Sequence, residues 1–338
     1  MGFPAPAAHP KQTKENPPAG WDVVLVLARR QLHRFVSLEP RVLQGSDPDA
    51  IHDFRVASRR LQQVLDLLYA KPRSKKIRKM RRVIQRSRRV LSTVRNCDVL
   101  MQRVDHSLTR KRTGHRETWL TFRDYLEKLR SECFREAAGR LGRLNLSDFY
   151  VRLQDLWNLP PQPSADLQGA ATEGSQPLQE AEMAAFEDRV IRELRVIWEA
   201  FDAQVAKSRQ EQMPKSFHAV RIAAKRLRYL VEVIGELGAP GTKQVLARLR
   251  RLQQRLGDWH DREVVEQMMA EMLARPGFLR SNLDFAIQIE RLMQKNQKSK
   301  RLYEEKYFET GMDWAGASEQ KAWVLNFITK SPRVVLET

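Results

Sequence analysis

The chain has 338 residues, enough to bury a sizeable core, and its length fits about two folded units. Its 60 lysines and arginines outnumber 41 aspartates and glutamates, so the net charge of +19 favours a polyanionic partner such as nucleic acid, an anionic membrane surface or another polyanion. Two cysteines argue against a disulfide framework, and no apolar run reaches the roughly 18 residues of a membrane span, so a cytoplasmic protein is expected.

The N-terminal segment, residues 1–20, carries five prolines and no apolar signal core, which predicts a disordered leader rather than a secretory signal. Asp47 before Pro48 predicts a helix start, because aspartate caps a helix and proline suits its first position. Ser74 is expected to open a long helix in the same half. The helices expected in the first unit, residues 21–157, cover 21–37, 50–69, 75–94, 97–108, 118–141 and 148–157.

Residues 158–179 are rich in proline and glycine and are predicted to be a linker. A second unit over 180–310 follows, and a C-terminal tail over 311–338 carries Trp314 and Trp323, which we expect to dock on the body. The helices expected in this unit cover 180–209, 217–235, 242–257, 261–274 and 283–308. No segment alternates with period two, so the fold class is predicted to be all-α.

An internal repeat is the strongest signal in the sequence. The stretch HDFRVASRRL at residues 52–61 matches HAVRIAAKRL at 218–227, with histidine, arginine, alanine, arginine and leucine at the same offsets. Downstream, residues 91–100 align without gaps to 256–265. A repeat of about 165 residues indicates a duplicated domain rather than a solenoid, whose units run to roughly 20–50 residues.

Helix geometry places the polar residues of each repeat on one face, since offsets of 0, 3 and 7 residues share a side of a helix. The first stripe contains His52, Arg55 and Arg59, and the second contains His218, Arg221 and Lys225. Like charges at this spacing repel one another, so an anion lying along both stripes is the predicted reason for them. The opposite face of the first helix carries the apolar residues Phe54, Ala57, Leu61, Leu65 and Leu68, which are expected to be buried.

A second concentration of charge lies at residues 71–95, which hold twelve lysines and arginines and no acid. A run of positive side chains without acids favours an anion-binding site over an ordinary solvent-exposed helix face. The candidate contacts on this helix are Arg78, Arg82, Arg86 and Arg89. The matching helix of the second half is less basic, and its candidates are Arg251 and Arg255.

The doubled motif, H-x-x-R-x-x-x-R-R-L at 52–61 and H-x-x-R-x-x-x-K-R-L-R-Y at 218–229, resembles the CHAD family, the conserved histidine α-helical domain. The resemblance implies two helical bundles related by pseudo-twofold symmetry around a basic cavity. It also implies binding of inorganic polyphosphate and association with polyphosphate granules in bacteria. The motif residues that it adds to the two stripes are Arg60, Arg226 and Arg228. Asn96 departs from the family pattern, which suggests aspartate there, and His260 stands against Arg95 in the repeat.

Two other functions stay open. A nucleic-acid-binding protein would explain the charge equally well, but it predicts aromatic residues among the basic ones, and Tyr229 is the only one there. A phosphate-ester or anhydride hydrolase would need metal-binding carboxylates, for which Asp98 and Glu263 are the only candidates, and both are expected to form salt bridges with arginines instead. No catalytic motif is present, so a non-enzyme without metal or cofactor is expected.

The resemblance also leads to an expectation about pH. An anion beside His52 and His218 would favour their charged forms and raise the pKa of each ring above its reference value of about 6.5. The affinity for the anion is then expected to increase as the pH falls from about 8 toward 6. The three tryptophans Trp157, Trp198 and Trp259 lie in apolar stripes and are expected in the core.

Overall fold

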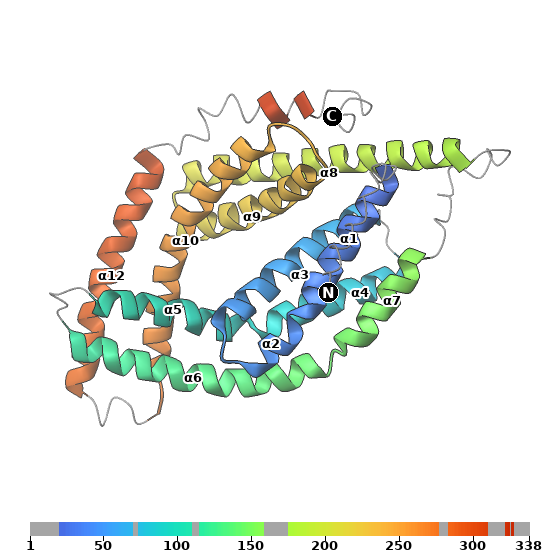
Figure 1. Cartoon of the computed structure of the whole chain (residues 1–338). Helices are drawn as coiled ribbons and strands as arrows, with labels where there is room; N and C mark the ends of the chain where they lie inside the picture. The colour runs from blue at the N-terminus through green and yellow to red at the C-terminus, as the bar shows by residue number, and fades with distance from the viewer. Residues whose placement is uncertain are drawn as a thin grey trace, which may run out of the picture.

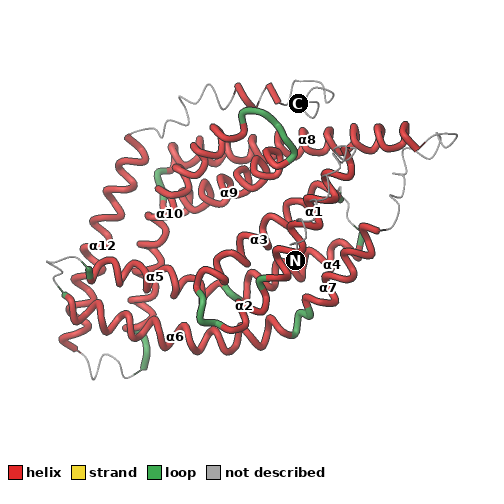
Figure 2. The backbone as a smooth tube through the Cα atoms, viewed as in Figure 1, coloured by secondary structure: helices red, strands yellow, loops and turns green. Residues whose placement is uncertain are grey.

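The fold is known from a computed structural model, which describes residues 20–69, 74–109, 115–158, 175–276, 283–309, 322–324 and 326–327. Within these residues the chain is helical and contains no strand, which confirms the all-α prediction (Figures 1 and 2). The helices are α1 (Gly20–Ser37), α2 (Glu39–Gln44), α3 (Pro48–Leu68), α4 (Lys75–Val90), α5 (Ser92–Leu108), α6 (Arg116–Gly142), α7 (Leu146–Asn158), α8 (Ser175–Glu211), α9 (Pro214–Glu236), α10 (Thr242–Leu273) and α12 (Leu283–Glu309).

Two predicted helix starts are confirmed by the hydrogen bonds of their capping side chains. The carboxylate of Asp47 accepts from the backbone amides of Asp49 and Ala50, at 2.9 and 3.1 Å, and Pro48 is the first residue of α3. Ser74 caps α4, because its Oγ accepts from the amide of Ile77 at 3.3 Å. Both caps satisfy amides that have no partner inside the first turn of a helix.

The second half departs from the sequence-based boundaries at α10, which is one continuous helix instead of the two expected over 242–257 and 261–274. Gly257 weakens a helix interior by about 1 kcal/mol. The side chains around it, Leu256 and Trp259, are each 2% exposed, and their burial requires the helix to continue. In the first half the expected break between two helices does occur, but it lies at Leu91 and not after residue 94. The short helix α2 was not predicted.

Aromatic packing forms the core of each half. In the first half Phe35 of α1 stacks on Phe54 of α3 with ring centroids 4.7 Å apart, and Phe149 of α7 meets Phe35 edge-on at 6.0 Å. In the second half Phe217 of α9 stacks on Trp259 of α10 at 5.2 Å. The apolar face predicted for α3 is buried along its whole length, and the three tryptophans expected in the core, Trp157, Trp198 and Trp259, are buried.

A second hydrophobic cluster joins the two halves at one end of the molecule. It combines Cys97 of α5 and Phe122 of α6 with Met269 of α10 and Ile289 of α12, each fully buried. Figure 1 shows α5 and α6 crossing α10 and α12 at this end. The halves therefore share a core and do not depend on the linker alone to stay together.

The described part of the C-terminal tail packs on the second half. The indole of Trp323 donates a hydrogen bond to the carbonyl of Pro240 at 2.9 Å, and Val324 and Phe327 are buried. Gly241 adopts φ +76°, and a Cβ there would lie 2.7 Å from the Trp323 ring, so a side chain does not fit. Trp314, residues 1–19 of the leader and residues 159–174 of the linker lie outside the described residues. The linker predicted over 158–179 was wrong at its end, because α8 already begins at Ser175.

No helix in the described ranges combines the length and the apolar character needed to cross a bilayer.

Candidate anion-binding site

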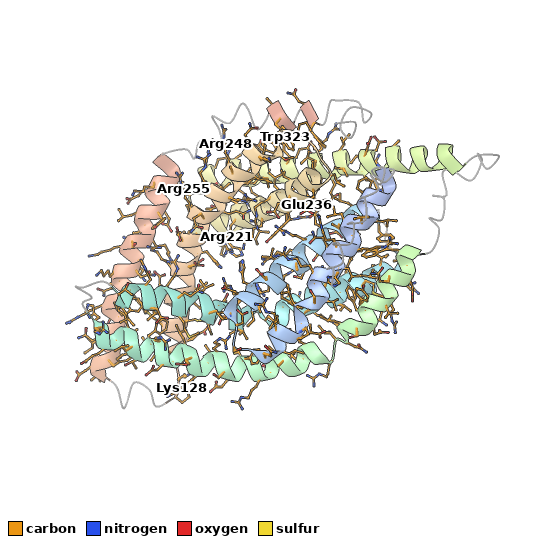
Figure 3. All side chains as sticks on the ribbon, viewed as in Figure 1. Lys128, Arg221, Glu236, Arg248, Arg255 and Trp323 are labelled. Atoms are coloured by element: carbon orange, nitrogen blue, oxygen red, sulfur yellow. The ribbon has the colours of Figure 1, made fainter. Side chains whose placement is uncertain are left out.

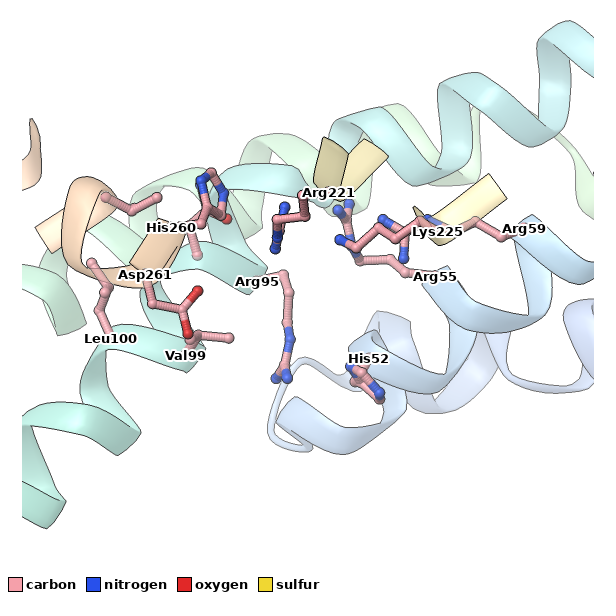
Figure 4. Close-up of a pocket in the computed structure, with 12 residues that line it drawn as sticks. His52, Arg55, Arg59, Arg95, Val99, Leu100, Arg221, Lys225, His260 and Asp261 are labelled. Carbon is pink, nitrogen blue, oxygen red and sulfur yellow. The ribbon is translucent and has the colours of Figure 1, made fainter. Parts of the chain in front are cut away.

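A cavity of about 190 Å³ lies between the two halves, where α3 and α5 of the first face α9 and α10 of the second. Figure 4 shows basic side chains entering it from both halves, and in Figure 3 Arg221 lies on the side of α9 that faces α3. Its lining residues are His52, Arg55, Arg59, Arg95, Asn96, Val99, Leu100, Arg221, Lys225, His260, Asp261 and Val264. Five of the predicted stripe residues are thus brought together.

The first stripe enters from α3. Arg55 is half-buried, and its guanidinium donates to the backbone carbonyl of Arg88 and, at 3.2 Å, to the hydroxyl of Ser92. Burial, together with the charges of neighbouring arginines, lowers the pKa of Arg55 to about 10. Arg59 reaches across to α9, where it donates to the hydroxyl of Tyr229 at 3.3 Å. The acceptors of these hydrogen bonds are a backbone carbonyl and two hydroxyls, all of them neutral. The positive charges of Arg55 and Arg59 are therefore not compensated by them.

His52 lies at the rim of the cavity, with much of its ring exposed to solvent. Partial burial lowers its pKa, and the charge of Arg95 lowers it further, while Asp53 opposes the shift. The ring is therefore neutral over most of the physiological pH range unless an anion enters the cavity.

The second stripe enters from α9 through Arg221 and Lys225. The Nε of Arg221 is buried and has no hydrogen-bond partner within the part of the chain that the structure describes. Burial lowers the pKa of Lys225 to about 7, with further lowering by Arg221, Arg59 and Arg55 in that order. A buried donor without a partner and an ammonium among guanidinium groups both cost free energy, which an anion would offset.

Two basic residues that sequence reasoning did not assign to the site complete the cavity. Arg95 comes from α5 and His260 from α10, and each has a buried nitrogen without a hydrogen-bond partner among the described residues. Burial lowers the pKa of His260 to about 3, aided by the charges of Arg221, His218 and Lys225. The repeat held the signal for this pair, since Arg95 and His260 align with each other. Asn96 is exposed and lines the same wall.

Negative charge in the cavity is limited to Asp261, the only carboxylate among the described residues that line it. That carboxylate is shared with Arg103, which contacts Asp261 at 3.1 Å and Asp258 at 2.9 Å. Among the described residues, the lysine and arginines that line the cavity form no ion pair with a carboxylate, although the charge of Asp261 acts on Arg221 from the cavity wall. Such an arrangement destabilises the empty fold and favours an anionic ligand.

Two motif residues form a buried ion-pair group outside the cavity instead. Arg60 of α3 and Arg228 of α9 both contact Glu232, at 3.1 and 3.5 Å, and the Glu232 side chain is 7% exposed. Arg228 also lies over the ring of Tyr229, 4.7 Å from its centroid. This group joins the two halves across the α3–α9 contact, and its cations are already paired.

The remaining candidates of the second half lie outside the cavity lining. The ring of His218 is exposed and stands 5.5 Å from the ring of His260, so it adjoins the wall. Arg226 is exposed on α9, and Arg251 and Arg255 are exposed on α10. Figure 3 shows Arg255 away from the face of α10 that looks onto α3.

The basic residues of α4 form a separate outer face. Arg82 and Arg86 border a groove together with Lys75, Lys79 and Val83, and Arg78 and Arg89 are exposed on the same helix. Within the described ranges these six lysines and arginines make no ion pair, whereas the inner residue Arg81 pairs with Asp66 at 2.6 Å. The face is a second cationic surface that does not line the cavity.

Of the two carboxylates considered for catalysis, Asp98 is held in an ion pair and Glu263 is not. Asp98 is buried and pairs with Arg130 at 2.6 Å, as predicted. The carboxylate of Glu263 lies 3.9 Å from the ring of His260 and pairs with no arginine in the described part of the chain, so the salt bridge expected there is not found.

Comparisons with known proteins agree with this architecture. A family model described as the CHAD domain matches residues 26–270. The crystal structure of the CHAD domain from the plant Ricinus communis superposes with a TM-score of 0.60 at 20% identity, covering 88% of this chain and 92% of that one. PptA from Streptomyces chartreusis gives a TM-score of 0.57 at 16% identity, covering 87% of this chain and 100% of the other.

No curated protein matches the sequence. The two structural likenesses, at these identities, show the shared fold. The family model spans well over half of the sequence, and on that ground the chain belongs to the CHAD domain family.

Proposed function

We propose that this protein binds inorganic polyphosphate in the cavity between its two halves. The observation that carries the proposal is the convergence of five lysine and arginine side chains, from both halves, on a cavity whose one carboxylate is shared with Arg103. Phosphate oxygens accept paired hydrogen bonds from guanidinium groups and point contacts from ammonium groups. A phosphate chain would give the buried guanidinium nitrogens of Arg95 and Arg221 the acceptors that they lack among the described residues.

Polyphosphate fits this cavity better than nucleic acid does. Apart from the two imidazoles, the described lining contains no aromatic side chain on which a base could stack. Tyr229 is 5% exposed and is already contacted by Arg59 and Arg228. Polyphosphate carries its charges on a narrow chain without bases, whereas a duplex is too wide for a cavity of about 190 Å³.

The outer face of α4 extends the proposal to longer ligands. A polymer held in the cavity could also contact the exposed cations Arg78, Arg82, Arg86 and Arg89, and the second contact would benefit from a high effective concentration. We infer a binding protein rather than an enzyme, and propose that it works in the cytoplasm in association with polyphosphate granules. Long chains should bind more tightly than short ones, because a short phosphate reaches only one of the two surfaces.

A competition experiment tests the ligand class. A fluorescent long-chain polyphosphate is bound to the full chain at fixed salt and displaced by unlabelled long-chain polyphosphate, tripolyphosphate, RNA or duplex DNA at equal phosphate concentration. Long-chain polyphosphate should compete at least about tenfold better than the others, a difference of about 1.4 kcal/mol. Equal competition by DNA would show that net charge alone drives binding.

A further inference from the structure

Lys225 differs chemically from the other strong bases of the cavity. Arg55, Arg59, Arg95 and Arg221 carry guanidinium groups that do not lose their protons in proteins. Lys225 is the one lysine among the described lining residues, and Arg59 takes its place in the first repeat. Only a lysine can offer a free amine there, so the two halves are not chemically equivalent at this position.

The surroundings of Lys225 favour the uncharged amine. Its side chain is half-buried in the cavity and lies beside Arg55 and Arg221 in Figure 4. Arg59 and Arg228 add to the positive field, and burial together with these charges lowers the pKa of Lys225 to about 7. A large fraction of the amine is therefore nucleophilic near neutral pH, the situation in which cationic neighbours activate a lysine.

We propose that Lys225 is a site of acylation by small acyl phosphates, compounds in which a carbonyl carbon is bonded to a phosphate oxygen. The guanidinium groups of Arg55 and Arg221 would hold the phosphate, and the carbonyl next to it would then lie within reach of the amine. The Nζ lone pair attacks the carbonyl carbon, and the bond from that carbon to the phosphate oxygen breaks. The proton of the amine passes to the departing phosphate, directly or through water, so that hydrogen phosphate leaves and an amide remains.

If the proposed function is right, acylation of Lys225 also weakens polyphosphate binding. The amide carries no positive charge and adds bulk to a cavity of about 190 Å³, so the modified protein should bind polyphosphate more weakly. The acylation itself does not require polyphosphate. The same guanidinium groups that would bind the polymer serve here to orient a small reagent.

The test measures acylation of the unmodified full chain, so no variant has to fold. The protein is incubated with acetyl phosphate near pH 7.5, and the acetylation rates of individual lysines are measured by mass spectrometry. Lys298, which is exposed on α12, is the matched control. Lys225 should react at least about tenfold faster, because a far larger share of its amine is neutral, although a weaker base is also a weaker nucleophile.

Two further measurements distinguish a reaction that depends on phosphate binding in the cavity from one that depends only on the reactivity of the Lys225 amine. Pyrophosphate should protect Lys225 and leave Lys298 unchanged, and an acetylating reagent without phosphate, the N-hydroxysuccinimide ester, should give a smaller preference for Lys225. Equal rates at the two lysines, no protection by pyrophosphate, or the same preference with both reagents would each overturn the proposal. Selective acetylation in a protein that fails to bind polyphosphate would contradict the proposed function alone, and the reverse result would contradict this inference alone.

Discussion

At the scale of single residues, the cavity cations are held together against their mutual repulsion. Lys225 shows this most clearly, because a lowered pKa means that the folded protein disfavours its charged form. Residues that serve a ligand in this way reduce the stability of the empty protein, a conflict between fold and function that is common at binding sites.

The change Lys225→Met should therefore stabilise the empty protein while weakening polyphosphate binding. The gain should be about 1–2 kcal/mol, which allows for partial solvent screening of the charge, and is measured by urea unfolding in phosphate-free buffer. It should be largest below pH 7, where the folded and unfolded states both carry the charge. As the pH rises from about 7 toward 10.5 the unfolded chain holds more protons, so wild-type stability increases and the gain shrinks. A variant that is less stable and binds equally well would contradict this account.

Lys225 also determines the pH dependence that the account predicts. The sequence suggested His52 and His218, but His218 does not line the cavity and the pKa of His52 is lowered by partial burial and by Arg95. Bound polyphosphate brings more negative charge beside Lys225 than one small phosphate does and restores the proton of its amine, so affinity for the polymer should fall as the pH rises above about 7 and change less below it. The fall should approach tenfold per pH unit for one proton.

Dissociation constants measured from pH 6 to 9 at fixed ionic strength check this dependence. In the Lys225→Arg variant the cavity keeps a charge that does not titrate, so its curve should be flatter than that of the wild type between pH 7 and 9. If the dissociation constant of the wild type changes only near pH 6, the group that titrates is a histidine and not Lys225.

At the scale of helices, periodicity predicts much of the site but not all of it. The stripes on α3 and α9 follow from spacing within one helix, and four of their residues, together with His52 at the rim, line the cavity. Spacing does not show which other helix meets a given face. For that reason Arg95 of α5 and His260 of α10 were missed.

The same limit applies to residues paired with distant acids. Arg60 belongs to the basic motif, yet it contacts Glu232, which is 172 residues away in the sequence. Arg228 contacts the same carboxylate from four residues away on α9, a pairing that helical spacing alone could have predicted. The boundaries of α10 were wrong for a related reason. Local propensity at Gly257 suggested a break, while burial of Trp259 against Phe217 keeps the helix continuous.

The outer face of α4 makes its own prediction. The triple change Lys79→Gln, Arg82→Gln and Arg86→Gln removes exposed cations without ion pairs in the described structure, so stability should change by less than about 0.5 kcal/mol per site. If the polymer contacts this face, the log–log plot of affinity against salt should become less steep by roughly 0.7–0.9 per lost phosphate contact. Affinity for tripolyphosphate should stay close to that of the wild type. If the salt dependence for long-chain polyphosphate is unchanged in this variant, the polymer does not contact the outer face of α4 and binds in the cavity alone.

At the scale of the whole molecule, the cavity exists because two halves share structure at several places. The cluster around Phe122 and Met269 joins them at one end, and the Glu232 ion pairs join α3 to α9. Arg103 connects α5 to α10 beside the cavity wall. A ligand that contacts α3 and α9 together therefore binds a set of basic side chains that neither half provides alone.

Two charge reversals of equal size test whether polyphosphate binds in the cavity. Arg55→Glu with Arg59→Glu changes the cavity, whereas Arg192→Glu with Arg195→Glu changes exposed residues of α8 that do not line it. Glutamates among the cavity cations should be tolerated by the fold, which circular dichroism checks. The dissociation constant for long-chain polyphosphate should rise about a hundredfold or more for the cavity pair and only a few-fold for the α8 pair. Equal losses from both pairs would contradict the claim that this cavity is the binding site.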